Sequence, residues 1–281
     1  MKRVCGISQL ALVSIAVLAS SLTFGVAGAS AASPTWLCVP KTAGTAVTSG
    51  GTGTKAECAT ETTTVELPPA GELPTLVSIL PYIKYEALGI DNQPTLRISG
   101  ANVQIVNGAG TTATTNGKGN LVIGYNETPG KQTGSHNLIL GSRQTFESYG
   151  GILAGYLNTI SGPWASITGG WGSTASGGES SVTAGFTNKA TGLSASVTGG
   201  YENTASGRFA SVSSGSLNLA GSEFASVTGG FLNKAENNQY ATVTGGYNNL
   251  ALGRLSTIFG GKNLKVHAEW EACGGFPTVL C

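Results

Sequence analysis

Side chains able to carry acid–base chemistry are few in this chain and lie far apart. Its one aspartate is Asp91, and its two histidines are His136 and His267. Enzymes that cut polysaccharides need paired acids, but the glutamates of the repeated region are unevenly spaced: Glu179, Glu202, Glu223 and Glu236. The P-loop, nucleotide fingerprint and HExxH motifs do not occur in the sequence. These residues predict no catalytic site, no cofactor and no metal site, and a polysaccharide-active enzyme is the least favoured alternative.

Aromatic and hydroxyl side chains, in contrast, recur at a fixed interval. The aromatic column is broken once, by Ser216, and consists of Tyr156, Trp171, Phe186, Tyr201, Phe231 and Tyr247. Aligned rings could form a ligand face that stacks on sugars, or they could pack at a turn or between subunits, which we favour. Hydroxyl columns such as Ser196/Thr198 resemble the Thr-x-Thr arrays of ice-binding faces, although one column is mostly serine.

The interval is set by a glycine that returns every 15 residues, with one step of 16. These anchor glycines are Gly155, Gly170, Gly185, Gly200, Gly215, Gly230, Gly246 and Gly261. Three residues before each anchor stands a β-branched residue, and these are expected to form the core ladder: Ile152, Ile167, Val182, Val197, Val212, Val227, Val243 and Ile258. Asparagine usually follows the anchor by three residues and alanine by five. Columns held in register over this length identify a repeat protein.

Each repeat predicts one coil of an all-β parallel β-solenoid, with about 15 residues per coil. Alternation along a strand places Val197 inside and Ser196 and Thr198 outside. The asparagines are expected at a turn, where Asn tolerates left-handed backbone and its amide can bond the next Asn in the stack. Each coil buries one Val or Ile and a few Ala, and this small apolar surface offsets only part of the conformational entropy that ordering a coil costs. Neighbouring chains are therefore expected to pack together, most simply as a homotrimer.

The N-terminus reads as an export signal. Lys2 and Arg3 precede an apolar run, and small residues then offer cleavage sites near Ala31. After cleavage four cysteines would remain: Cys38, Cys58, Cys273 and Cys281. An even number in an exported chain suggests disulfides. The spacing favours the pairs Cys38–Cys58 and Cys273–Cys281, and the other pairings stay open.

The remaining segments are expected to flank the array. Residues 1–31 would be the signal peptide and 32–66 a polar, disulfide-stapled segment. Residues 67–101 would form a short helix and a β-hairpin that cap the first coil. Irregular coils are expected over 102–150, the regular array over 151–263, and a C-terminal cap over 264–281.

The coil ASVTGGYENTASG, residues 195–207, resembles the head repeats of trimeric autotransporter adhesins, the YadA-like heads. The resemblance covers about residues 102–263. It implies a left-handed parallel β-roll interlocked as a trimer that binds host surface or matrix components. In the family Ala-Ile usually precedes the glycine, whereas this chain has Thr-Gly, Thr-Ala or Ser-Ser. The chain also shows neither a heptad stalk nor the strand pattern of an outer-membrane anchor. The order NVQIVNG, GNLVIGYNE, GSHNLILG and SYGGILAG ahead of the repeats also resembles exported bacterial proteins.

The amino-acid composition limits which kinds of binding partner are expected. Only 10% of the residues are charged and the formal net charge is +1, so nucleic acid is not an expected partner. No segment after the leader is apolar enough to span a bilayer. We therefore expect a secreted or cell-surface, non-enzymatic, adhesin-like module that associates with itself and with a matrix, glycan or surface component. A solenoid that binds glycans or ice through its aromatic or Ser/Thr ladder is the alternative.

Overall fold

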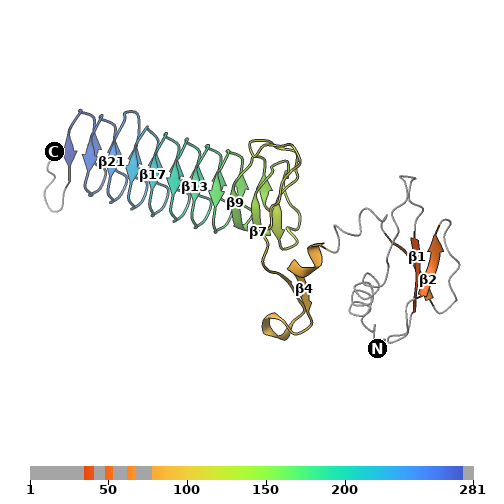
Figure 1. Ribbon diagram of the computed structural model, residues 1–281. Coiled ribbons are helices and arrows are strands. Elements are labelled where there is room, and N and C mark those ends of the chain that lie inside the picture. The colour runs from red at the N-terminus through yellow and green to blue at the C-terminus, as the bar shows by residue number, and fades with distance from the viewer. Residues whose placement is uncertain (1–34, 41–47, 53–61, 68–77, 275–281) are drawn as a thin grey trace. The chain divides into compact units, whose positions relative to one another are not determined.

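The computed structural model describes residues 35–40, 48–52, 62–67 and 78–274. The chain divides into two compact units, residues 1–103 and 104–281. Figure 1 shows the second unit as a stack of coils along one axis. The export signal and the segment 68–77, where most of the expected helix falls, lie outside the described residues.

The first unit contains two small antiparallel sheets. Strands β1 (Thr35–Pro40), β2 (Thr48–Thr52) and β3 (Thr62–Leu67) pair in the order β2-β1-β3, so strands occur in the segment expected to be a stapled loop. Strands β4 (Ile83–Glu86) and β5 (Thr95–Ile98) form the predicted hairpin around the short helix η2 (Ile90–Asn92). Pro81 lies within the short helix η1 (Leu80–Tyr82) that precedes it. The capping role of this segment stays a prediction.

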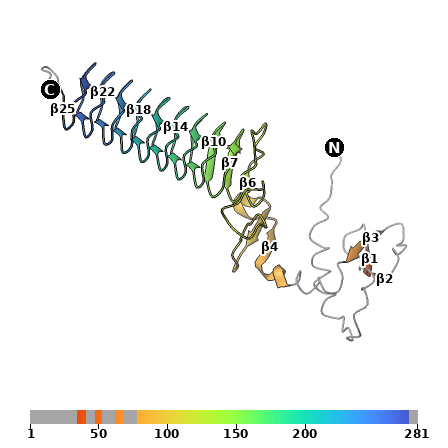
Figure 2. The same cartoon turned by 90° about the horizontal axis from the view of Figure 1, so that it is seen from above.

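The second unit is a parallel β-solenoid made of two facing sheets, and the view from above in Figure 2 shows its coils in register. The 11-stranded sheet contains β6 (Leu121–Ile123), β7 (Leu138–Ser142), β9 (Ile152–Tyr156), β11 (Ser166–Ile167), β13 (Ser181–Val182), β15 (Ser196–Val197), β17 (Ser211–Val212), β19 (Ser226–Val227), β21 (Thr242–Val243), β23 (Thr257–Ile258) and β25 (Ala272–Cys273). The 9-stranded sheet contains β8 (Thr145–Phe146), β10 (Thr159–Ile160), β12 (Thr174–Ala175), β14 (Lys189–Ala190), β16 (Thr204–Ala205), β18 (Leu219–Ala220), β20 (Lys234–Ala235), β22 (Leu250–Ala251) and β24 (Lys265–Val266). The predicted all-β solenoid with 15-residue coils is confirmed.

A narrow apolar core runs between the two sheets. From Ile167 to Ile258 every member of the expected core ladder is buried, facing alanines such as Ala190 and Ala205 from the other sheet. Successive Val side chains sit at paired positions of neighbouring strands, as Val182, Val197 and Val212 do. Because the facing column is alanine, the two sheets approach closely and each coil buries little apolar surface.

The prediction that Ile152 is the first member of the core ladder is wrong. Its side chain is 40% exposed, whereas Leu153 is fully buried and pairs with Ile139 on one side and Ile167 on the other. The steps between these three residues are 14 residues long, one fewer than in the regular array. The missing residue lies between the core position and the anchor glycine, because Leu153 precedes Gly155 by two residues while Ile167 precedes Gly170 by three.

The expected C-terminal cap also differs from the structure. Residues 265–273 continue both sheets, since β24 pairs with β22 and β25 pairs with β23. Val266 takes the alanine position and Cys273 the valine position, and both are buried. The solenoid therefore extends beyond residue 263 by a further coil.

A ladder of buried asparagines holds successive coils together. Nδ2 of Asn203 donates to the carbonyl oxygens of Gly199 (2.9 Å) and Gly215 (2.8 Å), and its Oδ1 accepts the backbone N–H of Asn218 (3.0 Å). Each asparagine thus bonds the next one in the stack, as expected, and it does so through the neighbour's backbone N–H. The left-handed residue of the turn is the one before the asparagine, such as Glu202 with φ 51°, and not the asparagine itself.

The anchor glycines are required by backbone conformation and by close approach. Their φ angles lie between 86° and 112°, a region that favours glycine. A Cβ added to Gly200 would also overlap the carbonyl oxygen of Gly215 and crowd Nδ2 of Asn203. The same glycine therefore makes the turn and leaves space for the asparagine ladder.

Candidate interaction surface

The predicted aromatic column forms a ladder along one edge of the solenoid, interrupted at Ser216. Each ring follows an anchor glycine, and its backbone bridges to the equivalent residue of the next coil. The rings of Trp171 and Phe186 have centroids 4.3 Å apart and planes 12° apart, and those of Phe186 and Tyr201 are 5.3 Å and 9° apart. We call Tyr156, Trp171, Phe186, Tyr201, Phe231 and Tyr247 the first ladder. Its side chains are between 37% and 46% exposed, so they form a surface.

The stacking decides which part of each ring faces solvent. Inside the first ladder both faces of a ring such as Phe186 are occupied by its neighbours, so its edge is the part left exposed. Sugars and cations bind aromatic rings through the face, where the π electrons lie. Rings inside an unbroken run are consequently poor platforms for sugars, and only rings at an end or beside an interruption have a face to offer.

Both ends of the first ladder are covered by the chain's own cations. The guanidinium carbon of Arg143 lies 5.6 Å from the Tyr156 ring centroid, and Nζ of Lys262 lies 5.3 Å from that of Tyr247. Arg143 belongs to the coil before Tyr156 and Lys262 to the coil after Tyr247. A cation over a ring face contributes about 0.5–1 kcal/mol at an exposed site. The terminal faces are therefore occupied.

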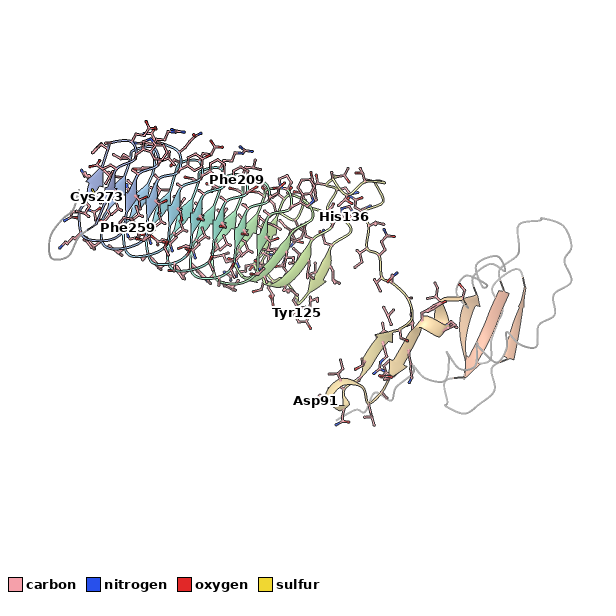
Figure 3. The ribbon with its side chains drawn as sticks, turned by 60° about the vertical axis from the view of Figure 1, so that its left-hand side comes forward. Asp91, Tyr125, His136, Phe209, Phe259 and Cys273 are labelled. Carbon is pink, nitrogen blue, oxygen red and sulfur yellow. The ribbon has the colours of Figure 1, made fainter. Side chains whose placement is uncertain are left out.

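A second aromatic ladder lies at the other turn of the coil, on residues that sequence reasoning did not single out. Phe209 stacks on Phe224 at 5.0 Å, and Phe224 on Tyr240 at 4.8 Å. Arg208 covers Phe209 at 4.3 Å. Figure 3 shows Phe209 on the edge of the stacked coils. These residues recur at the repeat interval just before the buried alanines, but Glu179, Ser194 and Leu255 occupy the same column and obscure the pattern.

The hydroxyl columns are not presented equally to solvent. The serines at the first position, such as Ser181 and Ser196, are half-buried, whereas Thr183 and Thr198 are exposed. Some hydroxyls are also used within the solenoid, since Thr168 Oγ1 donates to the carbonyl oxygen of Thr183 (3.0 Å). An ice-binding surface needs both columns free and level, so this face fits that role less well than the sequence suggested.

The titratable side chains are dispersed and serve local contacts. His136 Nε2 accepts the backbone N–H of Asn107 (3.0 Å), and its Nδ1 lies 3.1 Å from the carbonyl oxygen of Thr112, so the ring ties loops together. Glu223 pairs with Arg208 at 3.1 Å. His267 is exposed, and Asp91 lies in η2 with φ 49°. Within residues 78–274 no group of three or more His, Cys, Asp or Glu side chains could hold a metal ion.

A hydrogen bond with the Glu202 carboxylate raises the pKa of Tyr201 above its ordinary value, with the negative charge of Glu202 acting in the same direction. The contact matters here because it places a carboxylate beside one ring of the first ladder.

The outer face of the 9-stranded sheet carries a shallow depression of about 200 Å³. Leu232, Lys234, Leu250 and Lys265 line it together with Asn248, Asn249 and Asn263. Ligand pockets are usually about 300–1,000 Å³ and mostly enclosed. This depression is smaller and open, and it does not gather the titratable groups named above.

The cysteine pairs stay a prediction. Cys273 is buried in β25 at the last described coil. Cys38 belongs to β1, of which only the backbone is described, and Cys58 and Cys281 lie outside the described residues. Within the part of the chain that the structure describes, helices are too short to cross a membrane.

A scan against protein-family models finds no match to this chain, and a search of curated proteins finds no similar sequence.

Proposed function

We propose that this protein is an exported, non-enzymatic interaction module of the cell surface or the extracellular space. The observation that carries the proposal is the first ladder: a row of half-exposed rings held in fixed positions on a rigid solenoid. Exposed apolar patches that are this continuous mark sites where proteins bind other molecules. The adhesin-like role is supported by this surface and by the resemblance of the repeat to YadA-like heads. The left-handed sense of the coils rests on that resemblance alone.

Self-association is part of the proposal. The two sheets enclose mainly one Val and one Ala per coil, so the core is thin and a second or third copy would bury more apolar surface. We propose a homotrimer that leaves the first ladder on its outside. The cysteine pairs Cys38–Cys58 and Cys273–Cys281 would fit an oxidising extracellular setting.

The stacked geometry argues against sugars lying on the interior rings, and Arg143 and Lys262 cover the ring faces at the two ends, so the glycan-binding alternative is confined to the interruption of the first ladder at Ser216. A polysaccharide-active enzyme has less support, because His136, Glu179 and Glu223 are each engaged in separate local contacts.

Binding of purified protein to arrays of extracellular-matrix proteins and glycans tests the role of the first ladder. We expect binding that falls at least tenfold in the double variant Trp171→Ser/Phe186→Ser. The control is Thr168→Ala/Thr183→Ala, which changes the hydroxyl face of the same coils. Binding that survives in the ladder variant and is lost in the hydroxyl variant would contradict the proposal and favour the hydroxyl face.

A further inference from the structure

The first ladder is interrupted once within its length, at Ser216. The backbone of Ser216 bridges to Tyr201 on one side and to Phe231 on the other, so this coil is in register and only the ring is missing. The backbones of Tyr201 and Phe231 are therefore separated by two strand spacings, about 9.6 Å. We call the space above Ser216, between these two rings, the Ser216 gap.

The Ser216 gap has the dimensions of one missing rung. Stacked neighbours in the first ladder have centroids 4.3–6.5 Å apart. One planar group halfway between Tyr201 and Phe231 would lie about 4.8 Å from each, which is within that range. The gap therefore has room for a single flat group that contacts two ring faces.

The charge around the gap favours a cation. The faces of Tyr201 and Phe231 that border the gap carry the negative side of their π systems, and both attract a positive group placed between them. Elsewhere in the solenoid, three of the rings that end a stacked run are covered by a cation: Arg143 lies over Tyr156, Arg208 over Phe209 and Lys262 over Tyr247. Among the described residues, these three are the cations over rings, and none of them lies over Tyr201 or Phe231.

A carboxylate interacts with one of the two rings that border the gap. In the turns of the three coils concerned, 199–203, 214–218 and 229–233, the one charged residue is Glu202. Glu202 is exposed and interacts with the hydroxyl group of Tyr201, so its charge lies near the ring that borders the gap. A cation held there would meet two ring faces and one acidic group.

We propose that the Ser216 gap binds the guanidinium group of an arginine side chain presented by a partner polypeptide. Guanidinium is planar and stacks on aromatic faces, so it can contact Tyr201 and Phe231 at once and still donate hydrogen bonds to Glu202. An ammonium group is compact and strongly hydrated, and it fits the space between two parallel rings less well. This inference deepens the proposed function, since it names the chemistry of one position in the first ladder.

Saturation-transfer NMR on the full, assembled protein tests the proposal with N-acetylarginine amide as the probe. We expect saturable transfer to the arginine side chain with millimolar affinity, weaker transfer to N-acetyl-lysine amide, and none above background to N-acetylcitrulline amide, which is planar but neutral. Equal binding of the citrulline probe would overturn the proposal in favour of a neutral planar ligand. No saturable transfer from arginine would overturn it outright.

Three variants locate the binding. Ser216→Phe puts a ring into the gap and should abolish transfer, while Ser216→Ala leaves the gap open and should retain it. Glu202→Gln should weaken arginine binding about two- to fivefold, as expected for an exposed charge pair. Because Phe occupies this column in two other coils, Ser216→Phe should fold, and its melting temperature shows whether it does.

Arginine binding that persists in a folded Ser216→Phe protein would contradict the assignment to this gap. Failure here, with matrix or glycan binding still lost in the Trp171→Ser/Phe186→Ser variant, would leave the proposed function standing. If arginine binding survives in Ser216→Phe and matrix or glycan binding survives in the Trp171→Ser/Phe186→Ser variant, both the arginine site and the proposed function are contradicted.

Discussion

At the scale of single residues, the asparagine ladder adds side-chain hydrogen bonds between successive coils to those made by the backbone. The strands of the regular array are two residues long, and backbone hydrogen bonds at the turns also join successive coils, such as the one from Tyr201 N–H to the carbonyl oxygen of Gly215 (3.0 Å). The side chain of Asn203 adds three hydrogen bonds at the turn: two are part-buried, and the one from the backbone N–H of Asn218 is buried. At Ser173 the shorter side chain keeps one of these bonds, from the backbone N–H of Asn188 (3.2 Å). A serine in this column therefore makes fewer hydrogen bonds than an asparagine, but it still provides an acceptor for the backbone N–H of the next coil.

The substitution Asn203→Ala should destabilise the solenoid by about 2–3 kcal/mol, because it leaves the buried N–H of Asn218 without an acceptor. Asn203→Ser should cost less, because its hydroxyl can still accept that N–H. Hydrogen exchange read at the Asn218 amide, beside thermal unfolding, measures both effects. Thr204→Ala, which changes the neighbouring half-buried strand residue, is the control. Unchanged protection of the Asn218 amide in Asn203→Ala would show that the ladder bond is not needed.

Of two adjacent glycines in the turn, the backbone and the packing require glycine at one position but leave space for a Cβ at the other. Gly200 has φ 93° and its added Cβ would overlap the next coil, whereas Gly199 has open space around its Cβ position. We expect Gly200→Ala to cost about 3 kcal/mol or more, or to prevent folding of the coil. Gly199→Ala should change stability by less than about 1 kcal/mol. Chemical denaturation compares the two proteins, and equal midpoints would refute this reading of the turn.

At the scale of the elements, the repeat predicted most of the solenoid because its columns coincide with backbone requirements. The anchor glycine, the inward Val and the alanine of the second sheet each occupy a position that admits few other residues. Ile152 was assigned to the core because counting from Gly155 assumes a full coil, and the shorter coil there moves Leu153 inward. Val266 and Cys273 kept the correct spacing, but their types differ from the columns they continue, so residues 264–273 were read as a cap.

The aromatic surface was predictable only in part. The first ladder is nearly uniform in type, whereas the second mixes rings with Glu179, Ser194 and Leu255. The orientation of the rings could not come from sequence, because it depends on the spacing of the coils. The role of Arg143 and Lys262 at the ladder ends likewise requires the three-dimensional positions of the preceding and following coils.

The early coils offer a direct test of the corrected register. Leu153→Ala removes a fully buried side chain and should cost about 2–5 kcal/mol. Ile152→Ala changes a side chain that is 40% exposed and should cost less than about 1 kcal/mol. Thermal or urea unfolding of the two variants gives the comparison. The reverse order would restore Ile152 to the core and contradict the shorter coil.

At the scale of the whole molecule, the solenoid is stiff, repetitive and thinly cored. Its coils contact only their neighbours in the stack, so stability is a sum of similar coil-to-coil interfaces. Exposed rings run along two edges, and apolar surface of that extent marks sites where proteins bind other molecules. An interaction module that also self-associates accounts for both features, because assembly adds buried surface that one chain lacks.

Light scattering coupled to size-exclusion chromatography tests this central claim most directly. For the chain lacking residues 1–31, at micromolar concentration, the account predicts a single species of three times the chain mass. Its mass should be unchanged by Ser216→Phe, since the first ladder is proposed to lie outside the assembly. A clean monomer over the same concentration range would contradict the account.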